Sequence, residues 1–145
     1  MNTKYLLVLA CVAMVFLSFA VAVRMFLIRV AEMKEKRLHP QAIADSNQSA
    51  AALQVVKASD NYRNLFEMPV LFYLLCGLLI SLEMSQVSYV IGAWLYVLLR
   101  YGHSYVQCTY NKVLHRFRLF MASVIVLVLM WLGLTFQVFT LLFAQ

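Results

Sequence analysis

A short polar stretch, NYRNLFEMP, stands at the start of a long apolar run near the middle of this chain. Arg63 and Glu67 are four residues apart, and Asn64 and Glu67 are three apart, so on a helix the three side chains share one face. Pro69 follows, lacks a backbone donor and favours a kink close to that face. An ionisable side chain within an apolar segment is costly and usually faces a partner or a cavity.

A second polar stretch, RYGHSYVQ, has the same character. Arg100, His103 and Gln107 follow the spacing of one helical stripe. If the two stretches lie at the same depth on neighbouring helices, their polar faces can converge on a single site.

The simplest interpretation of these residues is an interhelical ion pair between Glu67 and Arg100. That pair leaves a surplus of cationic donors, because Arg63, His103 and Arg116 remain, together with an arginine at the end of the first apolar segment. Guanidinium groups bind carboxylates through two parallel hydrogen bonds. We therefore expect a pocket for an anionic ligand. The three histidines share no metal-ligand spacing, so no metal site is expected.

The composition places this site in a membrane protein. The chain has 145 residues, 64% of them hydrophobic and 12% charged, where about 25% is usual for a soluble domain. A helix needs about 20 mostly apolar residues to cross a bilayer. We predict an all-α integral membrane four-helix bundle, formed by residues 1–145 as a single domain. The spans are expected at about 5–30, 65–82, 86–108 and 119–143. The first could instead be a signal peptide, but its apolar run continues past Arg24.

Lysine and arginine predict the orientation, because they concentrate in cytoplasmic loops. They cluster in the connections 31–63 and 110–118, whereas the other side holds only Lys4. We expect both connections in the cytoplasm and both termini on the opposite side. Asp45 and Ser46 are candidate caps of a helix that runs into the second span. The net charge of +6 is explained by topology, so no nucleic-acid partner is expected.

Two motifs resemble those of a known family. RNLFEMP resembles the R-N-x-x-E signature of MAPEG proteins, the membrane-associated proteins in eicosanoid and glutathione metabolism. RYGHSYVQCTYNKVLHRFR resembles their third-span R-x-x-H/Y motif with its distal arginine. The resemblance covers nearly the whole chain, which looks like a bacterial member.

This resemblance implies a homotrimer that binds glutathione between protomers, in the half facing the cytoplasm. Transferred residue by residue, it implies that the co-substrate is bound by Arg63, Asn64, Glu67, Arg100, His103 and Gln107, and by a first-span arginine, Arg29 rather than Arg24. The resemblance also places Arg116 near the thiol of glutathione. Arg116 is therefore the first candidate for a catalytic role, and His103 is the second.

One residue departs from the family pattern in a way that bears on activity. Many members have a tyrosine where this chain has Gln107, which can form hydrogen bonds but cannot act as an acid. We expect a glutathione-dependent transferase, with peroxidase or isomerase activity as variants, acting on lipophilic electrophiles from the surrounding lipid. The alternative is a non-catalytic membrane scaffold of the same fold that binds lipid or glutathione.

Overall fold

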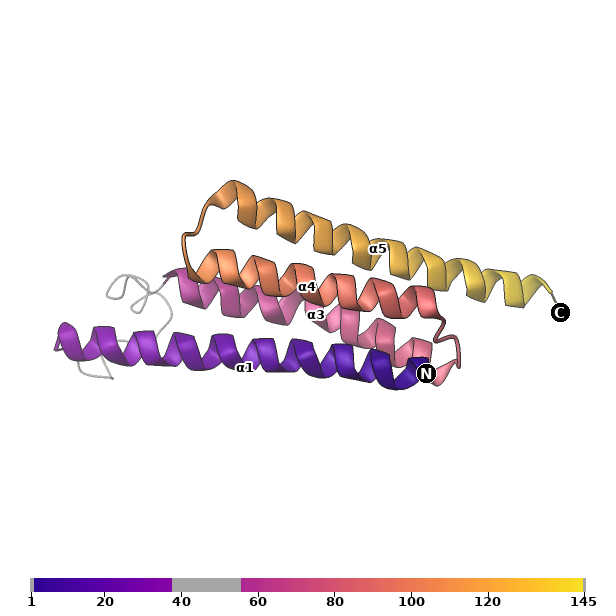
Figure 1. The fold of residues 1–145 in the computed structure, drawn as a ribbon, viewed down its shortest axis with the longest axis horizontal. Coiled ribbons are helices and arrows are strands. Elements are labelled where there is room, and N and C mark those ends of the chain that lie inside the picture. Colours follow the sequence, from indigo (N-terminus) through magenta and orange to yellow (C-terminus); the bar gives the residue numbers. More distant parts are fainter. Residues whose placement is uncertain (1, 38–55, 145) are drawn as a thin grey trace.

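The computed structural model describes residues 2–37 and 56–144, and these residues form four long helices without any strand. The helices are α1 (Thr3–Glu35), α3 (Val56–Ser81), α4 (Val87–Cys108) and α5 (Val113–Phe143). They lie side by side in an up-and-down bundle (Figure 1). The predicted all-α fold is confirmed.

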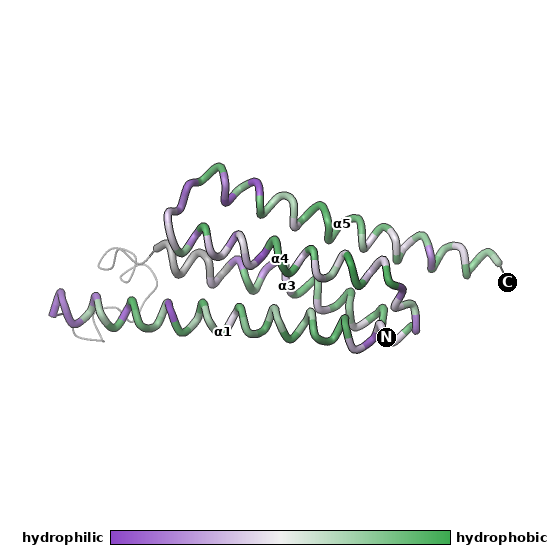
Figure 2. The backbone as a smooth tube through the Cα atoms, viewed as in Figure 1, coloured by the Kyte–Doolittle hydropathy of each residue, from purple (hydrophilic) through white to green (hydrophobic). Residues whose placement is uncertain are grey.

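Three of the described helices are long and apolar enough to cross a membrane: α1, the part of α3 from Asn64 to Ser81, and α5. The fourth, α4, is less apolar because Arg100, His103 and Gln107 lie in its second half. Figure 2 shows the contrast between hydrophilic segments in that half of α4 and the largely hydrophobic C-terminal half of α5. These three polar side chains are nevertheless buried.

The surface of the bundle is apolar, as expected for helices surrounded by lipid. On α1, buried residues recur at every turn, at Leu7, Ala10, Met14, Leu17 and Val21. The opposite side of the same helix exposes large apolar side chains, among them Phe16, Phe19 and Phe26. Patches of this extent are unusual on soluble monomers and fit contact with lipid or another protein.

Two helices extend beyond the membrane spans predicted from the sequence. α1 continues to Glu35, because good helix formers follow Ile28 and Lys36 forms an ion pair with Glu32 at 2.7 Å. It stops where Arg37 adopts a φ of 51°. α5 begins at Val113, within the predicted connection 110–118, so Arg116 lies in a first helical turn. The predicted caps Asp45 and Ser46 lie outside the described residues.

Helix α4 packs against each of the other helices that the structure describes, and two polar contacts fix it to α1. The Tyr101 hydroxyl donates to the Ala13 carbonyl oxygen at 2.8 Å, and the Arg24 guanidinium donates to the Cys108 carbonyl oxygen. A cation suits the carbonyl groups at the end of a helix. Both contacts help to hold the polar stripe of α4 in position.

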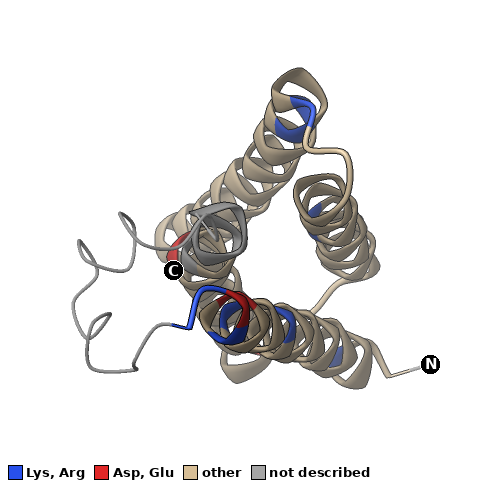
Figure 3. Ribbon diagram, turned by 90° about the vertical axis from the view of Figure 1, so that its left-hand side faces the viewer, with Lys and Arg blue, Asp and Glu red and all other residues tan. Residues whose placement is uncertain are grey.

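Basic side chains gather at one end of the bundle, which we call the basic end. It comprises the C-terminal turns of α1 and α4 and the N-terminal turns of α3 and α5. Figure 3 views the molecule from this side and shows lysine and arginine on α1, α4 and α5. At the other end, the amine of Lys4 contacts the Glu83 carboxylate at 2.9 Å, so the lone basic residue there is paired.

The Lys4–Glu83 pair predicts a pH dependence. The hydrogen bond from Lys4 holds the pKa of Glu83 below its usual value of 4.5. The pKa of Glu83 is lower in the folded protein than in the unfolded chain. The contribution of the pair to folding stability is therefore present above pH 4.5, and it is lost as the pH falls through the lowered pKa. We expect Glu83→Gln to lower the melting temperature slightly at neutral pH and by less at about pH 3. An equal effect at both pH values would contradict this, and Glu35→Gln serves as the control.

Candidate functional site

A small pocket opens at the basic end, between three helices. Its volume is about 220 Å³. Asn64 of α3, His103 of α4 and Arg116 of α5 supply its polar lining. Its apolar lining comes from Val113, Phe117 and Phe120 of α5. The pocket therefore joins the two polar stretches of the sequence, as predicted from their helical spacing.

His103 is held in a fixed orientation by α5. Its Nδ1 atom lies 3.0 Å from the backbone carbonyl oxygen of Arg116. A carbonyl oxygen only accepts hydrogen bonds, so Nδ1 carries the hydrogen and donates it. In the neutral imidazole, the buried Nε2 atom is then the basic nitrogen. The ring can therefore accept a proton through Nε2.

Arg116 reaches the pocket from the first turn of α5. Its Nη1 donates to the Asn111 side-chain oxygen at 3.4 Å. Asn111 lies in the connection before the helix and adopts a φ of 46°, a conformation that asparagine tolerates better than most residues. The turn thus helps to position the guanidinium, which remains partly exposed.

Arg100 lies deeper in the bundle and is fully buried, with 0% of its surface exposed. Its Nε donates to the Tyr96 hydroxyl at 3.2 Å. The guanidinium carbon lies 5.4 Å from the centre of the Tyr96 ring and 5.0 Å from that of Phe120, within range of cation–π attraction. Because Phe120 also lines the pocket, Arg100 lies directly behind the pocket wall.

The donors of Arg100 are only partly satisfied. Its Nη1 and Nη2 atoms are buried and have no hydrogen-bond partner among the described residues. A buried cation without a counter-ion is strongly unfavourable. Cation–π contacts offset only part of that energy, since each contributes about 0.5–2 kcal/mol. The arrangement is suited to a nearby anion.

Among the side chains that the structure describes, the remaining predicted site residues do not line this pocket. Gln107 is buried in the last turn of α4. Glu67 is exposed on α3, and no ion pair joins it to Arg100 in the described part of the chain. Arg29 is partly buried, with its Nε enclosed. Arg63 belongs to α3, but its side chain lies outside the described residues.

Sequence reasoning missed the aromatic residues of the site. Phe120 contacts His103, with ring centres 5.8 Å apart, and Tyr96 bonds to Arg100. A signal existed for Phe120, because it lies four residues after Arg116 and at helical spacing from the buried Ser123 and Leu127. Tyr96 likewise lies four residues before Arg100.

The burial of Arg100 leads to a prediction about stability. In Arg100→Met, a flexible apolar side chain of similar length replaces the buried cation. Such replacements are often neutral or stabilising. We expect the melting temperature of the detergent-purified protein, followed by tryptophan fluorescence, to stay unchanged or rise.

If Arg100 instead stabilised the fold through a satisfied ion pair, Arg100→Met would lower the melting temperature. Breaking a satisfied buried ion pair costs about 3–5 kcal/mol, which corresponds to a fall of about 6 °C or more in a domain of this size. Arg118→Met provides the matched control, because Arg118 is exposed on α5.

Comparison with known proteins agrees with these observations. No curated protein and no solved structure matches the chain. The sequence profile of the MAPEG family matches residues 6–136, a range that contains both polar stretches and every residue lining the pocket. With nearly the whole chain matched and both motifs within the match, the protein belongs to the MAPEG family.

Proposed function

We propose that this protein is a membrane-bound glutathione-dependent transferase acting on lipophilic electrophiles. The observation that carries the proposal is the pocket at the basic end. There, Asn64, His103 and Arg116 meet beside the buried guanidinium of Arg100, whose Nη1 and Nη2 atoms have no hydrogen-bond partner among the described residues. Membership of the MAPEG family supports glutathione as the co-substrate. The two carboxylates of glutathione would provide the negative charge that this pocket lacks.

The proposal places all four helices across the membrane. The connections 82–86 and 109–112 are short and join α4 to α3 and α5 at opposite ends of the bundle. Since α3 and α5 are apolar enough to cross, α4 must cross beside them. Its polar side chains are buried within the protein, so they need not contact lipid. The excess of basic residues favours a cytoplasmic location for the basic end, with both termini opposite.

The proposal also includes assembly into a homotrimer. A pocket of about 220 Å³ is smaller than the roughly 300–1,000 Å³ of typical ligand sites. A single protomer therefore provides only part of a site for a tripeptide. Glu67 supports a contribution from a neighbour, because its carboxylate is exposed on a helix that otherwise presents Phe66 and Val70. A charged group on such a face calls for a polar partner.

The chemistry follows from the cations and the fixed imidazole. A free thiol has a pKa of about 8.5, so little thiolate is present at neutral pH. The Arg116 guanidinium would stabilise thiolate by charge and hydrogen bonding, and each unit of lowered pKa corresponds to about 1.4 kcal/mol. His103 Nε2 would accept the proton. The thiolate sulfur would then attack an electrophilic carbon that arrives from the bilayer. The C–S bond would form as a leaving group departs from that carbon with its bonding electron pair, and His103 would return the proton to the leaving group. Phe117 and Phe120 would limit the access of water.

A second candidate function is a scaffold that binds glutathione or lipid without turning it over. Gln107 favours this possibility, because it is buried in the last turn of α4 and has no ionisable hydroxyl. The two functions share the same pocket, so the formation of thiolate distinguishes them.

The proposed activity predicts an absorbance change. Titrating glutathione into the detergent-purified protein at neutral pH should give a saturable ultraviolet difference signal from thiolate. In Arg116→Ala, we expect the signal to fall several-fold, up to about tenfold for each pKa unit by which the thiol pKa rises. Binding measured by calorimetry should weaken much less, since the remaining polar contacts persist.

Arg118→Ala is the matched control, because it removes an exposed arginine from the same helix and should leave the signal intact. Equal losses of thiolate and of affinity in Arg116→Ala would contradict the role given to Arg116. Saturable binding without any thiolate would favour the scaffold.

A further inference from the structure

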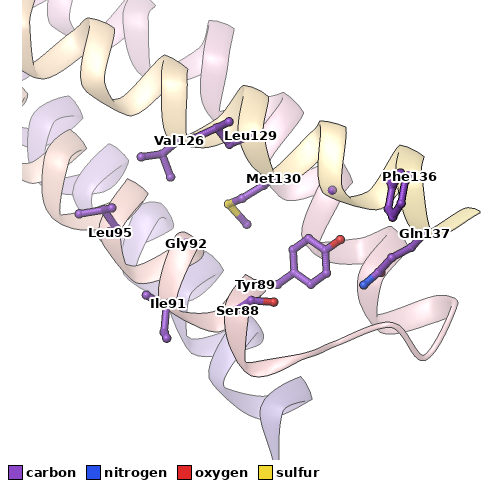
Figure 4. A pocket seen from close by; sticks show the side chains of 11 residues that line it. Ser88, Tyr89, Ile91, Gly92, Leu95, Val126, Leu129, Met130, Phe136 and Gln137 are labelled. Atoms are coloured by element: carbon purple, nitrogen blue, oxygen red, sulfur yellow. The ribbon is translucent and has the colours of Figure 1, made fainter.

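A second and larger pocket lies at the other end of the bundle, away from the basic end. It is formed between the first half of α4 and the second half of α5 and has a volume of about 490 Å³. This size falls within the range typical of sites for small molecules. Figure 4 shows the side chains that line it.

Two glycines shape this pocket. A Cβ atom at Gly92 would lie 3.0 Å from the Met130 sulfur, and one at Gly133 would lie 3.1 Å from the Tyr89 hydroxyl oxygen. Each glycine therefore accommodates a large side chain of the facing helix. Tyr89 and Met130 are almost fully buried, so they form the floor of the pocket. The rim includes Ile91, Leu129 and Phe136, which are 64%, 62% and 71% exposed and open the pocket sideways toward lipid.

The lining of this pocket becomes less polar from the end of the bundle toward its middle. Ser88 and Gln137 lie near the start of α4, whereas Leu95 and Val126 lie toward the middle of the bundle (Figure 4). Along α4, residues 88 and 95 are separated by about 10 Å, at about 1.5 Å per residue. A lipid molecule changes from a polar head to an apolar tail in the same direction. The pocket therefore matches an amphiphile aligned with the bilayer.

Gln137 provides a specific polar contact for such a molecule. Its side-chain oxygen is buried and has no hydrogen-bond partner among the described residues. Figure 4 shows the amide extending from α5 toward Tyr89. A buried acceptor without a donor is unfavourable, and a hydroxyl group of a ligand can supply that donor. None of the residues lining the pocket is charged, so a charged headgroup would find no counter-ion there.

We propose that this pocket binds an uncharged lipid with a free hydroxyl group, of the monoacylglycerol type. The hydroxyl donates to the Gln137 side-chain oxygen near the membrane surface, and the acyl chain lies along Leu95 and Val126. This site is separate from the pocket at the basic end, and it does not depend on glutathione chemistry.

Photolabelling tests the proposal. A monoacylglycerol with a diazirine in its acyl chain is added to the full-length protein in phosphatidylcholine nanodiscs, and labelled peptides are mapped by mass spectrometry. We expect labelling of the lining segments of α4 and α5, with competition by unlabelled monoacylglycerol. The methyl ester of the same diazirine fatty acid, which has no hydroxyl, should label these segments weakly.

Variants identify the contacts. Leu95→Trp fills the deep end of the pocket and should abolish the competed labelling. Leu98→Trp should not, because Leu98 lies on the same helix, is exposed and lies outside the pocket. In Gln137→Met, labelling by the monoacylglycerol should fall about tenfold, the effect of losing about one hydrogen bond.

Several outcomes would overturn the proposal. They are equal labelling of the two tryptophan variants, labelling without competition, and a Gln137→Met variant that labels like the wild type. A disulfide between protomers that forms in Leu129→Cys and not in the wild type would also overturn it, because a second copy of the chain would then cover the pocket.

Discussion

The guanidinium of Arg100 is enclosed in an apolar bundle, and the polar half of the structure is organised around it. The aromatic rings of Tyr96 and Phe120 lie beside it, and the Tyr96 hydroxyl accepts its Nε hydrogen. These contacts leave two of its nitrogen atoms without described partners. Since a buried cation is unfavourable without an anion, the position of Arg100 makes most sense if negative charge reaches the site.

The two ends of the bundle differ in the polarity of the side chains that they enclose. At the basic end, α4 is polar inside and meets Asn64 of α3 and Arg116 of α5. Toward the other end, α4 and α5 enclose a pocket that is almost entirely apolar, with Gln137 at its mouth. Helix α4 contributes to both, and its contacts with α1 hold it in place. We propose that one small protomer thus presents a site for a polar anion and another for a neutral amphiphile.

Much of this arrangement could be predicted from the sequence. Apolar run length predicted the helices, and the i, i+3 and i+4 spacing predicted that His103 and Asn64 face one site. Spacing alone could not show that Arg100 lies behind Phe120, because that depends on how α5 packs on α4. Nor could spacing show that Glu67 forms no ion pair with Arg100. The rotation of α3 relative to α4 depends on how the two helices pack. Helix α5 begins before the predicted span 119–143, because the charged residues around Arg116 form a helical turn ahead of the apolar segment.

The central claim is that the pocket at the basic end binds an anionic thiol through its cations. Calorimetry with two analogues tests this most directly: glutathione sulfonate, in which a permanent anion replaces the thiolate, and S-methylglutathione, in which the sulfur is neutral. We expect the sulfonate to bind the detergent-purified protein about tenfold or more tightly than S-methylglutathione, the effect of one charge-assisted contact. This preference should disappear in Arg116→Ala. Equal affinities for the two analogues, or no binding of either, would show that the cations of the pocket do not bind an anionic thiol.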